Sequence, residues 1–400
     1  MHDLGAFGTL GAPVFFRFSA PVSDMRKVNC IKVITRAHTL GYCGGVRMAV
    51  RMAEHARAHH RGSVYTLGPL VHNPVTLARL RARGIECLDP AHLSFALHAP
   101  AAPGAAPHAV EEKTARTVVI RAHGVAPEVY EALERSGAQV VDATCPRVKE
   151  SQRRAQGFAA QGLHVILAGD RNHGEIVGIE GYVRAGAAQA CSHLPGGAPD
   201  GMLPQVQCFV VQNAREAAAL PCLARAALLA QTTITQGEYD AIAAAARTRV
   251  RELTVARTIC AATARRQAAL RALAPTVEAL LVIGGAHSAN TQRLLHTARE
   301  TSLPTWLVER VEDIPPDIYA FSAVGISAGA STPDCVIAAV EQALRTGGAP
   351  VASRVSSSAL PKVSTCRAVC AAATSSVGSA GASGAVSPGA VRPFAVGSVR

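Results

Sequence analysis

The sequence is poor in aromatic residues and has no long apolar run. Phe, Trp and Tyr make up 4% of its 400 residues although 49% are hydrophobic, so its cores must be built from Ala, Val, Leu and Ile. No stretch reaches the roughly 18 to 20 uninterrupted apolar residues of a membrane span. The apolar piece from Ala12 to Phe16 lacks the basic start and the cleavage site of a secretory signal. We therefore expect a cytoplasmic protein that does not associate with a membrane.

Acidic residues are also scarce, with 28 Asp and Glu against 40 Lys and Arg, which gives a formal net charge of +12. The basic residues are scattered and are not interleaved with aromatic residues, as they are in many nucleic-acid-binding surfaces. Residues 351–400 contain no acid and contribute five of the twelve charges. The excess therefore indicates general anion affinity, and we expect no nucleic-acid partner.

The eleven cysteines are an odd number and lack the regular spacing of a disulfide framework. In a reducing cytoplasm a disulfide scaffold is not expected. Free cysteines are commonly small buried hydrophobic residues. This interpretation is applied to Cys30, Cys87, Cys191, Cys208, Cys222, Cys335, Cys366 and Cys370.

Both ends of the chain lack apolar periodicity. Residues 1–29 are interpreted as a disordered lead or a wrongly assigned start, because Met25 is an available initiator. Residues 347–400 are rich in Ser, Ala and Gly and are expected to be a disordered basic tail. The core should span residues 30–346, divided near 30–117, 118–230 and 231–346, with segments possibly exchanged between lobes. Residues 90–116 and 185–204 are expected to be inserted loops.

One pattern recurs within this core: a short apolar strand, a tight loop carrying Gly with His or Ser, and an amphipathic helix. It occurs at residues 118–135, at residues 164–176 and beyond, and at residues 279–300. Strands that alternate with helices predict an α/β fold with mostly parallel sheets, in which ligands gather at the carboxyl ends of the strands. The repetition favours three small lobes over one continuous sheet.

Three cysteines differ from the others because small residues surround each of them. They lie in Gly41-Tyr-Cys43-Gly-Gly45, Asp142-Ala-Thr-Cys145-Pro146 and Thr258-Ile-Cys260-Ala-Ala-Thr263. More than 100 residues separate each one from the next, which excludes a local zinc knuckle. Three thiolates without a fourth partner fit a four-iron cluster that leaves one iron open. Three ordinary buried thiols remain the alternative.

A second set of residues is typical of anion binding, because each lies in a loop before a helix, where free N–H groups favour phosphate. The alternative is ordinary helix capping. Glu175, at a helix start, is either a partner of the helix dipole or a proton donor. No Walker loop or dinucleotide fingerprint is present. The set comprises His72, Asn73, His123, His173, Gln231, Thr232, Thr233, Ser288, Asn290 and Ser331.

Together these motifs resemble the LytB-type family of 4-hydroxy-3-methylbut-2-enyl diphosphate reductases. The resemblance runs in order from about Lys32 to Ala343 and leaves both ends without a counterpart. Besides the three cysteine motifs, it rests on Val71-His-Asn73, Ala122-His-Gly-Val125, His173-Gly-Glu175, Gln231-Thr-Thr233, Ser288-Ala-Asn290 and Ala328-Gly-Ala-Ser331.

The resemblance implies a three-lobed α/β fold around a central cavity that holds one [4Fe-4S] cluster. Its three ligands match Cys43, Cys145 and Cys260, and the substrate hydroxyl binds the remaining iron. Thr232 matches the threonine near that hydroxyl and Glu175 the acid that supplies protons, with His173 as a second candidate. The diphosphate is held by residues that match His72, His123, His173, Ser288, Asn290 and Ser331.

The implied reaction is the last step of the non-mevalonate pathway to isoprenoid precursors. Two electrons and two protons remove the hydroxyl as water and give isopentenyl and dimethylallyl diphosphates. The chain shows no flavin or nicotinamide domain, so an external donor of the ferredoxin or flavodoxin class is implied.

The sequence departs from the family pattern at two positions. Ala289 stands where the family usually has a second serine, and Gly174 stands where a proline usually precedes the acid. Both put turnover in question more than identity. Two other functions compete: a non-enzymatic cluster protein that senses oxygen or iron, and a metal-free module that binds a phosphorylated metabolite. The first would not need Glu175 and Thr232, and the second would not need the three cysteines.

Overall fold

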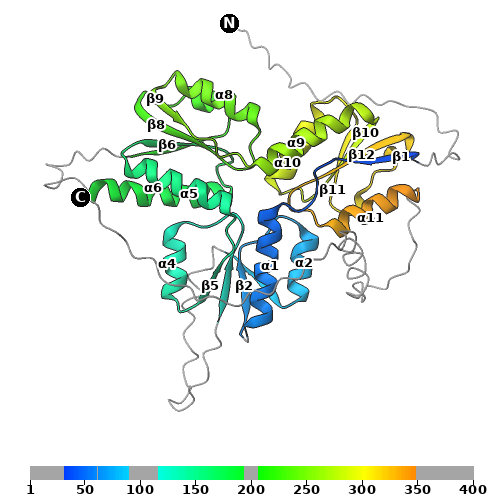
Figure 1. Ribbon diagram of the computed structural model, residues 1–400, viewed down its shortest axis with the longest axis horizontal. Helices are drawn as coiled ribbons and strands as arrows, with labels where there is room; N and C mark the ends of the chain where they lie inside the picture. Colours follow the sequence, from blue (N-terminus) through cyan, green and yellow to red (C-terminus); the bar gives the residue numbers. More distant parts are fainter. Residues whose placement is uncertain (1–30, 61, 90–115, 193–205, 348–400) are drawn as a thin grey trace, which may run out of the picture. The chain divides into compact units, whose positions relative to one another are not determined.

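The computed structural model describes residues 31–60, 62–89, 116–192 and 206–347. These residues form three sheets of four strands each, and every strand pair is parallel. Helices follow most of the strands (Figure 1). This arrangement confirms the predicted α/β fold with three small lobes and parallel sheets.

The first lobe contains a sheet in the order β3-β2-β4-β5. Val119 of the central strand β4 packs on one face, whereas its neighbours Val118 and Ile120 pack on the other. This alternation places an apolar core on both faces of the sheet, as parallel sheets require. The elements are α1 (Gly44–His59), β2 (Val64–Leu67), α2 (Pro74–Ala82), β3 (Ile85–Leu88), β4 (Thr117–Ile120), α4 (Pro127–Arg135) and β5 (Gln139–Asp142).

The second lobe contains a sheet in the order β7-β6-β8-β9. In β8, Leu228 packs on one face and Leu229 on the other. Helices α5 and α6 lie side by side against this sheet (Figure 1). The elements are α5 (Pro146–Ala160), β6 (His164–Ala168), α6 (Gly174–Ser192), β7 (Cys208–Val211), α7 (Ala214–Ala218), β8 (Leu223–Ala230), α8 (Gln236–Arg247) and β9 (Val250–Val255).

The third lobe contains a sheet in the order β1-β12-β10-β11. Every residue of β10 is buried, and its side chains alternate between two apolar clusters. The elements are β1 (Val33–Arg36), α9 (Ala261–Leu273), β10 (Ala279–Ile283), α10 (Ala289–Arg299), β11 (Thr305–Val308), β12 (Ala323–Ala328) and α11 (Asp334–Arg345). Three 3-10 helices span Ala274–Thr276, Val311–Asp313 and Pro316–Ala320.

Sheet membership differs from the approximate boundaries expected from the sequence. Strand β4 spans the expected boundary between residues 117 and 118, and β5 lies beyond it, yet both pair within the first sheet. Strand β9 lies after residue 231 yet pairs within the second sheet. Strand β1 belongs to the third sheet, where it pairs with β12 and places Val33 opposite Ala323. About 290 residues separate these two partners in the sequence. The recurring pattern identified strands and helices, but it carried no information on which strands pair.

The expected loop at residues 185–204 is wrong at its start, because α6 continues to Ser192. Residues 185–190 are Ala-Gly-Ala-Ala-Gln-Ala, and alanine has the highest intrinsic helix propensity. The rest of that loop, almost all of residues 90–116, the lead at 1–29 and the tail beyond Gly347 lie outside the described residues.

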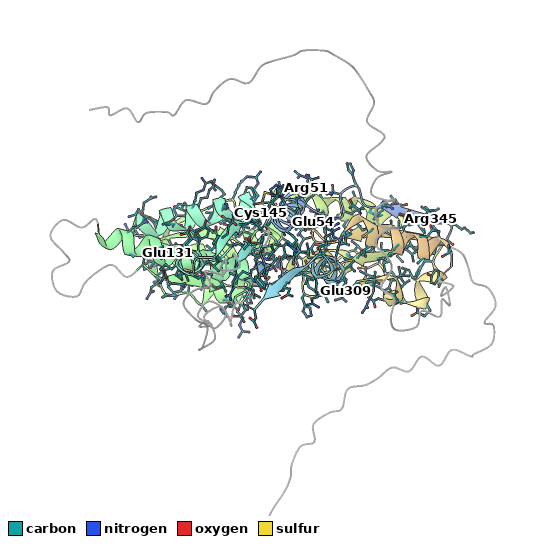
Figure 2. All side chains as sticks on the ribbon, turned by 90° about the horizontal axis from the view of Figure 1, so that it is seen from below. Arg51, Glu54, Glu131, Cys145, Glu309 and Arg345 are labelled. Atoms are coloured by element: carbon teal, nitrogen blue, oxygen red, sulfur yellow. The ribbon has the colours of Figure 1, made fainter. Side chains whose placement is uncertain are left out.

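Most charged side chains of the described part lie on its surface, whereas Glu175 and Arg266 are buried. Glu131 and Arg345, for example, are exposed and lie on the outside of the molecule (Figure 2). None of the described helices has both the length and the apolar composition that crossing a membrane requires.

Candidate functional site

All eleven residues that the resemblance assigns to the site line one cavity, whereas Asn73 and Gln231 of the wider anion-binding set do not. The empty space in this cavity amounts to about 750 Å³, a value that includes open solvent. Its lining includes Cys43, Cys145, Cys260, His72, His123, His173, Glu175, Thr232, Ser288, Asn290 and Ser331. Residues from all three lobes therefore meet at a single place.

Each of the three cysteines is the N-cap residue of a helix: Cys43 of α1, Cys145 of α5 and Cys260 of α9. All three cysteines have extended or near-extended backbone, so each helix begins directly after its cysteine. The Sγ of Cys43 accepts a hydrogen bond from the Val46 N–H at 3.4 Å. Free N–H groups at helix starts stabilise a thiolate.

Small residues keep the space between the sulfur atoms open. A Cβ placed on Gly45 would lie 2.6 Å from the Sγ of Cys145 and 4.0 Å from the Sγ of Cys43. Burial, together with the nearby Cys43 and Cys260 sulfurs, raises the pKa of the Cys145 thiol. A thiol in such a place loses its proton readily only when a cation or metal compensates the charge.

The sulfur atoms do not converge on a point that one ion could occupy. Among the described residues, the group whose ligand atoms lie within 4.8 Å of one another is formed by three histidines, not by the cysteines. A cluster of several irons binds each thiolate through a different iron, so its ligands need not converge. The cysteines therefore fit a multinuclear group, and the histidines have the spacing of a single-ion or anion site.

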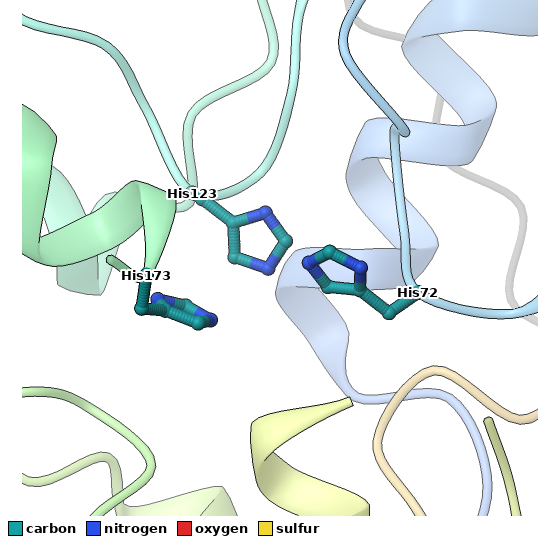
Figure 3. A group of neighbouring side chains, drawn as sticks. All are labelled: His72, His123 and His173. Atoms are coloured by element: carbon teal, nitrogen blue, oxygen red, sulfur yellow. The ribbon is translucent and has the colours of Figure 1, made fainter. Parts of the chain in front are cut away.

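The three histidines form a compact trio (Figure 3). His72 lies in the loop after β2, His123 in the loop after β4 and His173 in the loop before α6. The ring centroids of His123 lie 5.0 Å from His72 and 5.1 Å from His173. The Nδ1 of His123 is buried and has no hydrogen-bond partner. An unpaired buried polar atom of this kind indicates a missing ligand.

The trio is neutral at physiological pH. Burial lowers the pKa of all three rings, and the pKa of His173 falls to about 4 because the His72 ring adds to the effect of burial. Three neutral imidazoles offer N–H donors that suit phosphate oxygens. A bound anion would in turn raise their pKa values.

Glu175 and Thr232 form a buried pair at the cavity wall. The Oε1 of Glu175 accepts a hydrogen bond from the Thr232 N–H, and its Oε2 accepts one from the Thr232 hydroxyl, both at 2.7 Å. Glu175 is 1% exposed, and burial raises its pKa to about 7 despite these hydrogen bonds. A carboxyl with such a pKa can be protonated at neutral pH and still release its proton.

Polar neighbours fix the position of this pair. Gln231, which is fully buried, accepts a hydrogen bond from the Asp170 N–H at 2.7 Å and donates one to Thr233 at 2.9 Å. Arg293 holds the Asp170 carboxylate through two hydrogen bonds of 2.9 and 2.8 Å. The loops that carry Glu175 and Thr232 are thus tied together from two lobes.

The side of the cavity that belongs to the third lobe presents hydroxyl and amide groups. Ser288 caps α10 by accepting a hydrogen bond from the Thr291 N–H, and the Ser331 hydroxyl lies 3.4 Å from the Ser288 hydroxyl. The Asn290 amide oxygen accepts a hydrogen bond from the Ala330 N–H at 2.9 Å. Ala289 also lines the cavity, but it contributes no side-chain donor.

Besides Arg147, which lines the cavity, and Arg293, two further arginines near the site were not singled out from the sequence. Arg266, 3% exposed, lines the cavity and donates to the Gly41 carbonyl. Arg121 directly follows β4, and its guanidinium lies against Gly174, the residue after His173. The sequence does contain a signal for each: Arg266 lies on the same helix face as Thr263, and Arg121 directly precedes the Ala122-His-Gly motif.

The chain was compared with known proteins. The family model described as "LytB protein" matches residues 34–345. A 4-hydroxy-3-methylbut-2-enyl diphosphate reductase from Treponema denticola is 42% identical over 325 residues, which cover 79% of this chain and all of the relative. The same-named protein of Aquifex aeolicus is 33% identical over 317 residues, covering 79% of this chain and 96% of the relative.

Two solved structures of reductases are also similar to this chain. One of (E)-4-hydroxy-3-methyl-but-2-enyl diphosphate reductase, the terminal enzyme of the non-mevalonate pathway, has a TM-score of 0.53 at 33% identity and covers 78% of this chain and 99% of that one. A reductase from Plasmodium falciparum shares the fold at a TM-score of 0.63 and 21% identity, covering 76% of this chain and 85% of that one. The matches span the described core, and this chain belongs to the LytB family.

Proposed function

We propose that the chain is a 4-hydroxy-3-methylbut-2-enyl diphosphate reductase that makes isopentenyl and dimethylallyl diphosphates. The observation that carries this proposal is that three cysteines, a neutral histidine trio and the Glu175–Thr232 pair line one cavity. A sensor of oxygen or iron would need only the first of these features, and a phosphometabolite-binding module only the second. The names of the similar proteins agree with the combination.

The cysteines are proposed to hold one [4Fe-4S] cluster. The fit is supported by the shared cavity, by the position of each thiol at a helix start and by the space that Gly45 leaves beside two sulfurs. When bound, the cluster supplies electrons and an open iron that acts as a Lewis acid on the substrate hydroxyl.

The diphosphate is assigned to the histidine trio together with Ser288, Asn290 and Ser331. Neutral imidazoles, hydroxyls and amides donate hydrogen bonds to phosphate oxygens, and the α10 helix start adds free N–H groups. The unpartnered Nδ1 of His123 gains a partner in this arrangement. A metal ion at the trio is less well supported, because the charge of Arg121 disfavours a further positive charge on all three rings.

Glu175 is proposed to supply a proton to the leaving hydroxyl through Thr232. One proton and the departing hydroxyl form water as the C–O bond breaks, and a second proton adds to carbon at either end of the allyl group. Two electrons complete the balance, and the position of the second proton decides which of the two products forms. The pKa of Glu175, near 7, suits a donor that works at neutral pH.

The two electrons must come from outside the chain, and a protein of the ferredoxin or flavodoxin class is the proposed donor. We also propose a cytoplasmic location, where free thiols stay reduced. In the described part of the chain, Cys43, Cys87, Cys145, Cys208, Cys222 and Cys260 are free thiols.

The proposal is tested with protein purified without oxygen. Iron and sulfide should be present at four of each per chain, and a chemical reductant should drive conversion of the allylic diphosphate to both products. Cluster without conversion would favour the sensor, whereas diphosphate binding without iron would favour the metal-free module. Either result would overturn the assignment.

A further inference from the structure

Arg121 is a partly buried cation for which the described part of the chain offers no counter-ion. It follows the last residue of β4, two residues before His123. Its Nε is buried and has no hydrogen-bond partner, and no described carboxylate forms an ion pair with it. Withdrawing a guanidinium from water without a partner is costly. Such a group persists where an anion completes it.

The charge of Arg121 reaches the whole histidine trio. It is among the groups that disfavour protonation of His72, His123 and His173. Asp170, the acid whose charge acts on the His173 ring, is already held by Arg293 through two hydrogen bonds. The fixed charge around the three rings is therefore positive, which opposes a metal cation there and favours an anion.

Gly174 makes room for this guanidinium. A Cβ placed on Gly174 would lie 2.3 Å from the Nη2 of Arg121 and 2.8 Å from its Cζ. Any side chain at position 174 would therefore displace the guanidinium from its place beside the helix start of α6. This glycine is also the position at which the sequence departs from the usual proline of the family.

We propose that Arg121 is the permanent cation of the diphosphate site and that Gly174 is the residue that lets its guanidinium lie behind the histidine trio. Arg121 does not line the cavity, so it is a positioning and charge-balancing residue that acts through the three rings. The inference rests on the proposed diphosphate site. It explains why neutral histidines suffice at the surface of that site.

The test uses the cluster-loaded protein and inorganic pyrophosphate as the probe, with binding measured by calorimetry. Arg121→Gln should weaken pyrophosphate binding by roughly tenfold, the effect of one unit charge at several ångströms in a partly screened site. It should raise KM for the allylic diphosphate with little change in kcat, and the salt dependence of binding should become shallower. Arg121→Lys should restore most of the affinity.

Gly174→Ala tests the role given to Gly174, because it keeps the charge of Arg121 but should displace the guanidinium. It should weaken pyrophosphate binding as Arg121→Gln does, and the double variant should be no weaker than either single one. The matched control is Arg135→Gln, which removes an exposed arginine at the end of α4 and should leave binding unchanged.

The outcomes separate the inference from the function on which it rests. Failure of the wild-type protein to bind pyrophosphate would overturn the diphosphate site itself and the inference with it. Normal binding by Arg121→Gln beside a binding wild type would overturn the inference alone. Should Arg121→Gln fold poorly, Gly174→Ala decides: unchanged affinity contradicts the inference. Additive losses in the double variant would remove the role given to Gly174.

Discussion

Thr232 donates both its backbone N–H and its hydroxyl to Glu175, one to each carboxylate oxygen, at 2.7 Å. Both hydrogen bonds favour the ionised carboxylate, yet burial outweighs them and the pKa rises to about 7. Once Glu175 is protonated, its O–H can donate to the Thr232 oxygen. The Thr232 hydroxyl is then free to turn toward a substrate in the cavity, so the pair has the geometry of a proton relay.

The first prediction is that Glu175→Gln abolishes most turnover without affecting the cluster. Glutamine keeps the shape, and its amide oxygen can still accept from the Thr232 N–H, while its NH2 group can donate to the Thr232 oxygen as a protonated carboxyl would. It has no acidic proton to give. Removing a positioned general acid usually costs about a hundredfold to ten-thousandfold in rate. Turnover, iron content and melting temperature are measured on the same sample.

The control for this variant uses Thr232, the hydrogen-bond partner of Glu175. Thr232→Ser keeps the hydroxyl and should retain most activity, whereas Thr232→Val should lose rate. If Glu175 served only the helix dipole, Glu175→Gln would lower stability by about 0.3 to 1 kcal/mol and leave the rate intact. That result would move the proton donor to His173.

The second prediction concerns pH. Because Glu175 must carry its proton to donate it, turnover should fall as the pH rises above about 7. The raised pKa also means that the folded protein binds this proton more tightly than the unfolded chain does. Its contribution to the free energy of unfolding therefore decreases as the pH rises from 4.5 to about 7.

Denaturant unfolding of the wild type and of Glu175→Gln at several pH values checks this sign. The stability of the variant relative to the wild type should increase across that pH range, since glutamine does not titrate. A relative stability that falls across the range would mean that the carboxyl is ionised in the folded state.

Sequence reasoning located the chemistry better than the architecture. Cys43, Cys145 and Cys260 could be singled out because glycine, alanine and proline lie beside them, and the structure places all three on one cavity. The pairing of β1 with β12 could not be predicted, because parallel pairing across about 290 residues leaves no local signal. Arg121 stands beside the Ala122-His-Gly motif in the sequence, but its relation to Gly174 exists only once two lobes meet.

The third prediction is that Cys43→Ser, Cys145→Ser and Cys260→Ser each lose iron and activity. A serine hydroxyl keeps the size but is a poor ligand for iron in place of a thiolate. Iron and sulfide are measured after purification without oxygen. Cys222→Ser is the matched control because Cys222 is exposed and lies outside the cavity, and it should retain both. Full iron retention in Cys145→Ser would contradict the ligand assignment.

The last prediction is that Ala289→Ser tightens substrate binding. Ala289 is the first residue of α10 and lines the cavity, while the neighbouring Ser288 hydroxyl is already engaged by the Thr291 N–H and Ser331. An added hydroxyl would therefore be free to donate to the diphosphate. A hydrogen bond to a charged group contributes about 1.5 to 3 kcal/mol, and ordering the new side chain offsets part of it. KM should fall severalfold with little change in kcat.

Ala214→Ser is the matched control for this change, because Ala214 is also the first residue of its helix, α7, but lies outside the cavity. It should leave KM unchanged, which separates an effect on the substrate from a general effect on helix starts. A KM that rises in Ala289→Ser would mean that the substrate packs against the Ala289 methyl group. Ser288 and Asn290 would then hold the diphosphate at a position displaced from the α10 helix start. The hydroxyl of a serine at position 289 would find no room beside the substrate.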